Sequence, residues 1–122
     1  MLVAASGEGE FNGRHSMICL NALNGSVIFY SSQNAEFTHS TTSSSSGAVI
    51  DFSNNGGPYG INGYNNTGGF MWTFPTASTV WNLKEIQDVN ADANTDIACF
   101  IGFNGTITIL SGSNGSLVWS QN

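Results

Sequence analysis

The sequence predicts an all-β protein, and three observations lead to that prediction. Charged residues make up only 8% of the 122-residue chain, whereas hydrophobic residues reach 40%, which is enough for a core and unlike a disordered chain. Glycine, asparagine, serine and threonine, which favour turns, are abundant. No window carries apolar residues at helical spacing for more than a turn, so we expect no helix.

A repeated segment indicates how the strands are organised. Residues 17–31 (MICLNALNGSVIFYS) align without a gap with residues 107–121 (ITILSGSNGSLVWSQ), and a weaker copy lies at residues 65–74. The matched glycines are Gly25, Gly68 and Gly115, and the matched rings are Phe29, Trp72 and Trp119. The glycines lie 43 residues (25 to 68) and 47 residues (68 to 115) apart, a period typical of a propeller blade. The prediction is one domain, residues 1–122, forming a partial β-propeller of four-stranded antiparallel blades.

The last copy gives the clearest blade, blade 3, at residues 79–121. Its strands are expected at TVWNLKEIQD (79–88), DIACFIGF (96–103), TITILSG (106–112) and SLVWSQ (116–121). The second of these is almost wholly apolar, as expected for a strand covered on both faces. Asn104-Gly105 is expected to form a two-residue hairpin turn, because both positions tolerate positive φ.

The middle copy predicts blade 2 at residues 35–75. Its strands are expected at AEFTHSTT (35–42), GAVIDFS (47–53), GINGY (60–64) and GFMWTF (69–74). In the first copy, blade 1 at residues 2–31, LVAAS (2–6) matches a second strand, so this blade would lack its first strand. Since closed propellers usually have about four to eight blades, the stack is expected to belong to a longer chain or to self-associate to close a ring. We favour a fragment of a longer protein.

The recurring rings Phe29, Trp72 and Trp119 are expected to be docking residues that pack between blades. A row of rings that stacks on a ligand is the alternative. Trp81 has no counterpart in the other copies. It is therefore expected at a blade edge or on a binding surface.

Acidic residues are concentrated in DVNADANTDI (88–97), which holds three of the eight in the chain. Carboxylates so close repel one another unless a cation or solvent separates them. Calcium takes about six to eight oxygen ligands, and a tightly turning loop directs every second side chain inward. The predicted calcium ligands are Asp88, Asn90, Asp92, Asn94 through its carbonyl, and Asp96. The alternative is a solvated, Asx-rich turn.

Two of these motifs resemble known repeats. LNALNGSVIF (20–29) and LSGSNGSLVW (110–119) resemble quinoprotein-like propeller repeats, with Phe29 in place of the usual tryptophan. DVNADANTDI resembles the calcium loop of the FG-GAP repeat, except that Ala93 replaces a glycine. Left-handed backbone at Ala93 would cost on the order of 1 kcal/mol. The combination looks like propeller domains of large secreted bacterial proteins, and this implies an extracellular or cell-surface location.

The formal net charge of −6, with Arg14 and Lys84 as the permanent cations, argues against nucleic acid and anionic membrane partners. No stretch approaches the length of a membrane span. The start of the chain does not read as a signal peptide, so residue 1 is not expected to be the natural start of a secreted protein.

Cys19 and Cys99 lie in apolar runs that fit no metal motif. Two buried thiols are expected, and a disulfide stays open.

The long loop at residues 6–16 carries several charged or titratable side chains, and it is a candidate contact for a ligand or partner. Its candidate residues are Glu8, Glu10, Arg14 and His15. His39 and Asp51 could join a serine in a triad, but no nucleophile motif supports this. No catalytic or cofactor-binding residue is therefore predicted.

Two hypotheses for function follow. The first is a non-catalytic scaffold or binding module of a secreted or cell-surface protein, with a protein or glycan ligand and a structural calcium loop. The second, implied by the resemblance, is a piece of a quinone (PQQ)-dependent dehydrogenase propeller. The second requires a cofactor funnel and a metal-bound carboxylate, and no residue of this sequence is identified for either.

Overall fold

The computed structural model describes residues 2–6, 15–33, 39–44, 47–53 and 58–122. These residues form eleven β-strands and contain no helix, so none of them belongs to a helix that could cross a membrane. The prediction of an all-β protein is confirmed.

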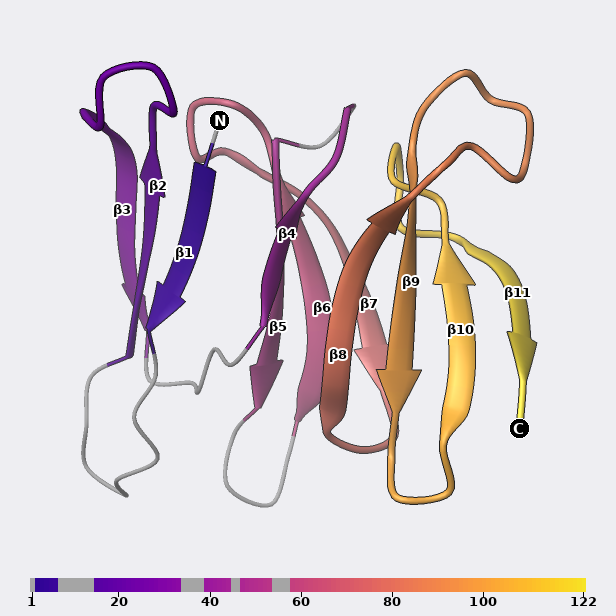
Figure 1. The fold of residues 1–122 in the computed structure, drawn as a ribbon. Coiled ribbons are helices and arrows are strands. Elements are labelled where there is room, and N and C mark those ends of the chain that lie inside the picture. Colours follow the sequence, from indigo (N-terminus) through magenta and orange to yellow (C-terminus); the bar gives the residue numbers. More distant parts are fainter. Residues whose placement is uncertain (1, 7–14, 34–38, 45–46, 54–57) are drawn as a thin grey trace.

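The strands form three antiparallel sheets in which each strand pairs with its neighbour along the chain (Figure 1). The first sheet contains β1 (Leu2–Ser6), β2 (His15–Leu20) and β3 (Val27–Gln33). The second contains β4 (Ser40–Thr42), β5 (Ala48–Ser53), β6 (Tyr59–Tyr64) and β7 (Phe70–Thr76). The third contains β8 (Val80–Ile86), β9 (Asp96–Ile101), β10 (Thr106–Leu110) and β11 (Leu117–Gln121). Two sheets are thus four-stranded as predicted, and β1 pairs directly with β2 as the predicted second strand of its blade.

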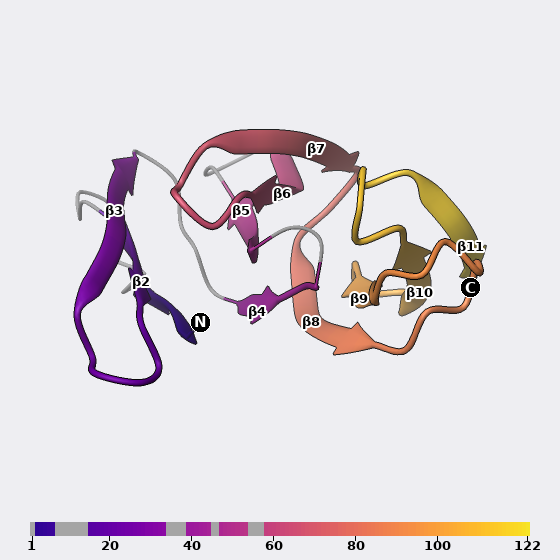
Figure 2. The same ribbon diagram turned by 90° about the horizontal axis from the view of Figure 1, so that it is seen from above.

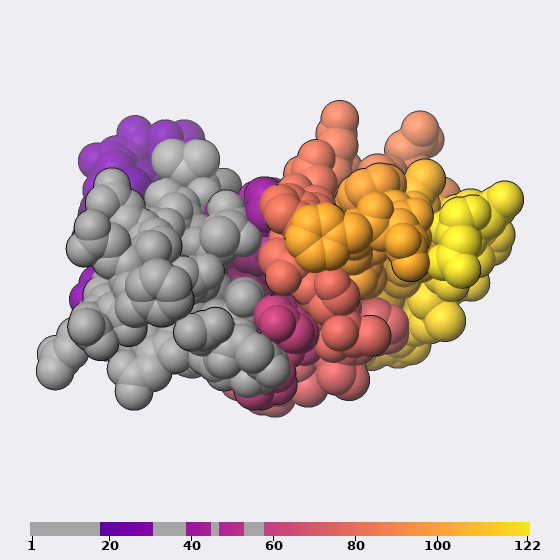
Figure 3. All heavy atoms as spheres, turned by 90° about the horizontal axis from the view of Figure 1, so that it is seen from below, coloured from indigo at the N-terminus to yellow at the C-terminus, as the bar shows by residue number. Residues whose placement is uncertain are grey.

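The three sheets stand in a row, face to face, and do not close into a ring within the described residues (Figure 2). The leading strands β4 and β8 lie side by side along one edge of this row. Seen from below, the atoms of the second and third sheets form one continuous surface (Figure 3). The row therefore has two outer faces, one on the first sheet and one on the third.

The turn between β9 and β10 differs from the prediction. β9 ends at Ile101 because Gly102 has a φ of +70° and its N–H donates to the Thr79 carbonyl at 2.9 Å. The N–H of Gly105 donates to the Gly102 carbonyl at 3.2 Å and closes a four-residue loop, residues 102–105. The prediction of a two-residue turn at Asn104-Gly105 was wrong, because two glycines rather than one supply the positive φ angles.

The predicted first strand of blade 2, residues 35–42, corresponds to β4, which has three described residues. Residues 34–38 lie outside the described residues, so only its second half is observed. The segment that is observed pairs with β5, as a leading strand should.

All three sheets share one irregularity of register next to the repeated aromatic residue. The ladder shifts between Cys19 and Leu20, between Gly63 and Tyr64, and between Ile109 and Leu110. The residues opposite Cys19, Gly63 and Ile109 are Phe29, Trp72 and Trp119, respectively. A bulge at the same place in each sheet means that the three rings occupy equivalent positions.

The turn before each ring is also repeated. Gly25, Gly68 and Gly115 have φ angles of +73°, +89° and +72°, a region that glycine adopts readily. The first and third turns have the same hydrogen bond, from Gly25 N–H to the Asn21 carbonyl at 2.7 Å and from Gly115 N–H to the Ser111 carbonyl at 2.8 Å. The repeat in the sequence thus encodes a repeated turn.

Rings and glycine turns meet at the boundaries between sheets. A Cβ atom on Gly68 would lie 2.7 Å from Cγ of Phe29, and a Cβ atom on Gly115 would overlap the ring of Trp72. Each ring therefore rests directly on the backbone of the next sheet. Trp119 occupies the equivalent position on the third sheet and is 46% exposed, because no described sheet follows it.

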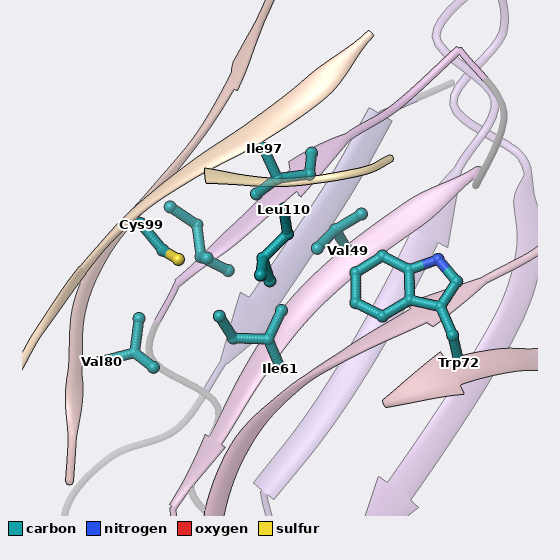
Figure 4. Close-up of a cluster of buried hydrophobic side chains, with 8 residues drawn as sticks. Val49, Ile61, Trp72, Val80, Ile97, Cys99 and Leu110 are labelled. Carbon is teal, nitrogen blue, oxygen red and sulfur yellow. The ribbon is translucent and has the colours of Figure 1, made fainter. Parts of the chain in front are cut away.

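Among the side chains that the structure describes, two apolar clusters fill the spaces between the sheets. The larger cluster joins the second and third sheets through Val49, Ile61, Trp72, Val80, Leu83, Ile97, Cys99 and Leu110 (Figure 4). The smaller cluster, in which Phe29 packs against Ala48, Ile50 and Tyr64, joins the first and second.

Cys19 and Cys99 are free and buried, so the prediction of two buried thiols is confirmed. Burial raises the pKa of Cys99 to about 12.

The contact between ring and turn gives a testable consequence. Gly115→Ala is expected to lower the free energy of unfolding by roughly 2–5 kcal/mol, because it adds a left-handed alanine and a clash with Trp72. Gly102→Ala is the matched control, because Gly102 has nearly the same φ but its nearest neighbour, Ser78 Oγ, lies 3.4 Å away. The control should lose only about 1–2 kcal/mol in urea denaturation. Equal losses in the two variants would contradict the proposed contact.

Candidate functional site

The acidic loop predicted from the sequence joins β8 to β9 (Figure 1). Asp88 follows β8, and its carboxylate accepts hydrogen bonds from Ala93 N–H at 2.7 Å and Asp92 N–H at 3.2 Å. These two bonds cross the loop and hold it in a compact turn. Short polar side chains commonly fix turns in this way.

Asp96, the first residue of β9, is fully buried. Its carboxylate accepts hydrogen bonds from Val89 N–H at 2.8 Å and Gly112 N–H at 3.4 Å. A buried carboxylate is costly unless it has such donors. Asp96 therefore fastens the start of the loop to the segment that follows β10.

Asp92 lies at the tip of the loop and reaches the turn between β10 and β11. Its carboxylate accepts hydrogen bonds from the hydroxyls of Ser113 at 2.8 Å and Ser111 at 3.2 Å, and from Asn94 N–H at 2.9 Å. The Ser113 hydroxyl, and after it the Asn94 N–H, lower the pKa of Asp92 because they stabilise the charged carboxylate. Ser111 and Ser113 were not predicted as partners, since they lie 19 and 21 residues further along the chain.

The backbone of the loop is strained at two alanines. Ala91 and Ala93 have φ angles of +63° and +69°, which cost an L-residue with a Cβ atom about 1–2 kcal/mol each. Ala93 is the position at which the FG-GAP loop has glycine. The backbone at this position is left-handed, so Ala93 carries the cost that left-handed backbone was expected to impose on it.

The donor set suits calcium chemically, because it consists of carboxylate and amide oxygens. In the described residues, however, no three His, Cys, Asp or Glu side chains gather around one point where a metal could lie. The carboxylates of Asp88, Asp92 and Asp96 instead face N–H and hydroxyl donors. Calcium binding by Asp88, Asn90, Asp92, Asn94 and Asp96 stays a prediction, and so does the alternative of a solvated, Asx-rich turn.

The end of the loop also contacts the second sheet. Thr95 N–H donates to Ser44 Oγ at 2.8 Å, and Ser44 N–H donates to Thr95 Oγ1 at 2.9 Å. The Thr95 hydroxyl additionally donates to Glu85 at 2.6 Å. The acidic loop therefore connects the second and third sheets. No local sequence pattern predicted this contact.

His39 and Asp51 do lie together. Their side chains meet at 2.6 Å between Nδ1 and Oδ2, and His39 N–H donates to Asp51 Oδ1 at 2.8 Å. Asp51 is 3% exposed and lies on β5, opposite the residues that lead into β4. The pair thus joins two neighbouring strands and supports their pairing.

The loop proposed as a ligand contact is largely outside the described residues, including Glu8, Glu10 and Arg14. His15 does not lie in that loop. It is the first residue of β2 and pairs with Gln33 of β3. The placement of His15 in a loop was wrong, because the strand begins earlier than its apolar residues indicate.

An exposed aromatic pair lies at the end of the third sheet opposite the acidic loop. Trp81 is 46% exposed and Phe103 is 90% exposed, and their rings meet edge to face with centroids 5.5 Å apart. Trp81 coincides with a register irregularity between Val80 and Asn82, which interrupts the alternation of β8. The surface position expected for Trp81 is confirmed, whereas Phe103 was missed because it was expected inside a strand.

Asp92 should make stability depend on pH in a defined window. Its folded pKa is lowered, so the stabilisation is present above the unfolded pKa, near 4, and is lost as pH falls through the folded pKa. Ser113→Ala should therefore lower the unfolding temperature at pH 7 and make its fall between pH 5 and pH 2 shallower. Ser120→Ala, an exposed serine of β11, is the control for thermal unfolding. An unchanged pH profile in Ser113→Ala would exclude this role.

The calcium prediction has a direct test. Millimolar calcium is expected to raise the unfolding temperature and a chelator to lower it, because bound metal stabilises the folded state by mass action. Asp92→Asn should abolish the response, whereas Asp51→Asn, outside the loop, should keep it. An unfolding temperature that does not respond to calcium would leave the hydrogen-bonded turn as the complete description of the loop.

Comparison with known proteins identifies no family for this arrangement. A scan against models of protein families and a search of curated proteins each gave no match.

Proposed function

We propose that this chain is a non-catalytic scaffold or binding module of a secreted or cell-surface protein, built as part of a β-propeller. Three equivalent sheets, each repeating the same turn, bulge and ring, support the propeller. The neighbouring leading strands β4 and β8 also support it, because blades surround a central channel.

The exposed pair of Trp81 and Phe103 carries the proposal of binding. Large rings are costly to leave in water, and Trp is among the residues that dominate the affinity of binding surfaces. Trp81 has no matching ring in the other copies of the sequence repeat. The repeated contact between ring and glycine turn therefore does not account for Trp81.

The ligand class follows from charge and chemistry. Lys and Arg together number two, whereas Asp and Glu together number eight, so the chain attracts anions only weakly. Exposed aromatic rings beside polar, uncharged turn residues suit the apolar face of a sugar or a neutral segment of protein. We propose a neutral glycan as the ligand, with a neutral protein segment as the second candidate.

Binding can be measured by calorimetric titration with neutral cello-, xylo- and manno-oligosaccharides. Trp81→Ala and Phe103→Ala should each weaken binding at least about tenfold, since both remove a ring from the contact. Trp119→Ala is the matched control, because Trp119 is equally exposed on the same sheet but belongs to the repeat.

Two results would count against this function. An unchanged affinity in Trp81→Ala would show that the aromatic pair is not part of the binding site. Reduction of a dye by the protein, after addition of the quinone with calcium, would favour the dehydrogenase instead.

A further inference from the structure

The same contact occurs at both boundaries between sheets. Phe29 of the first sheet covers Gly68 of the second, and Trp72 of the second covers Gly115 of the third. Among the described residues this leaves one ring and one turn of the set uncovered. The ring is Trp119, and the turn is that of Gly25, around which a Cβ atom would find no atom within 4 Å.

The outer face of the third sheet matches a face that is buried elsewhere in the chain. By register, Ile107, Ile109 and Trp119 occupy the positions that Ile61, Gly63 and Trp72 occupy in the second sheet. The residues of the second sheet are buried beneath the third sheet, whereas Ile107 and Trp119 are each 46% exposed. The exposed outer face of the third sheet is therefore equivalent to the face of the second sheet that the third sheet covers.

The outer face of the first sheet resembles the inner face of the third sheet, which is the face that packs on the second sheet. Leu20 corresponds by register to Leu110, which is fully buried against the second sheet, but Leu20 itself is only half-buried. Tyr30 lies opposite Ile18 on the same face and is exposed. This face and the outer face of the third sheet lie at opposite ends of the row (Figure 2).

The Gly25 turn closely reproduces the turn that Trp72 covers. The φ angles of Gly25 and Gly115 are +73° and +72°. Each turn contains an asparagine, Asn24 or Asn114, whose side-chain oxygen accepts the N–H of the serine two residues later at 2.9 Å. A tryptophan that fits the Gly115 turn thus has a second turn of the same shape at the other end of the molecule.

We propose that the third sheet of one copy docks on the first sheet of a second copy, with Trp119 lying on the Gly25 turn. The interface continues the row of sheets with the contact already present at its two internal boundaries. Its apolar residues, Ile107 and Ile109 opposite Leu20 and Ile18, carry no charge that would oppose association. The two faces differ, so the assembly is head-to-tail and can extend beyond a dimer. The proposal depends on the sheet repeat and is independent of ligand binding at Trp81.

Analytical ultracentrifugation over a range of protein concentrations tests this interface. The wild-type chain should form dimers and larger species as concentration rises. Trp119→Ala and Gly25→Ala should each weaken association at least about tenfold, because one removes the ring and the other places a Cβ atom beneath it. Trp81→Ala and Gly102→Ala are the matched controls and should associate like wild type, since Gly102→Ala brings the same backbone strain away from this interface.

A mixing experiment distinguishes a head-to-tail interface from a symmetric one. Trp119→Ala retains an intact Gly25 turn, and Gly25→Ala retains an intact Trp119. An equal mixture should therefore form heterodimers and no larger species, although each variant alone stays monomeric. A wild-type chain that is monomeric up to about millimolar concentration, or a mixture that does not associate, would overturn the proposal. The control variants show whether a loss of association comes from backbone strain rather than from the interface. Oligosaccharide titration measures ligand binding at Trp81, so failure of the ligand proposal is distinguishable from failure of this one.

Discussion

Direct contact between an aromatic ring and a glycine backbone is the constraint on which the arrangement of the sheets depends. Trp72 can lie against the third sheet only because Gly115 has no side chain beneath the ring. The residues around this contact, such as Val49, Ile61 and Leu110, pack at the separation that it sets. The same glycine also supplies the left-handed turn into β11, so one residue determines both the local chain path and the spacing of two sheets.

Much of the fold could be predicted because its determinants recur in the sequence at a regular interval. The match between the Gly25 and Gly115 segments was sufficient to locate equivalent strands and rings. Features without a repeated or local signal were missed. The contact between Ser44 and Thr95 joins residues 51 positions apart, and it depends on how two sheets meet rather than on either segment alone. The loop at Gly102 was misplaced because Asn104-Gly105 is an equally good turn signal when read locally.

The acidic loop shows how a chain with few charges uses its carboxylates. Asp88 closes the loop, Asp92 reaches the β10–β11 turn, and buried Asp96 joins both to the core. The carboxylates lie close in sequence, but each faces N–H or hydroxyl groups, and these donors offset the mutual repulsion. The residue types were predictable from the sequence, whereas their partners were not, because Ser111, Ser113 and Gly112 belong to a different hairpin.

The two internal boundaries are unequal, and this has a consequence for how the molecule opens. In a row of sheets each unit is stabilised mainly by its immediate neighbours, much as in a solenoid. Among the side chains that the structure describes, the boundary of the first sheet contains the smaller ring, Phe29, and the smaller apolar cluster, whereas Trp72 and the larger cluster lie at the other. Thermal fluctuations should therefore detach the first sheet more often than they separate the remaining pair, and amide protons of β2 should exchange with solvent before those of β9.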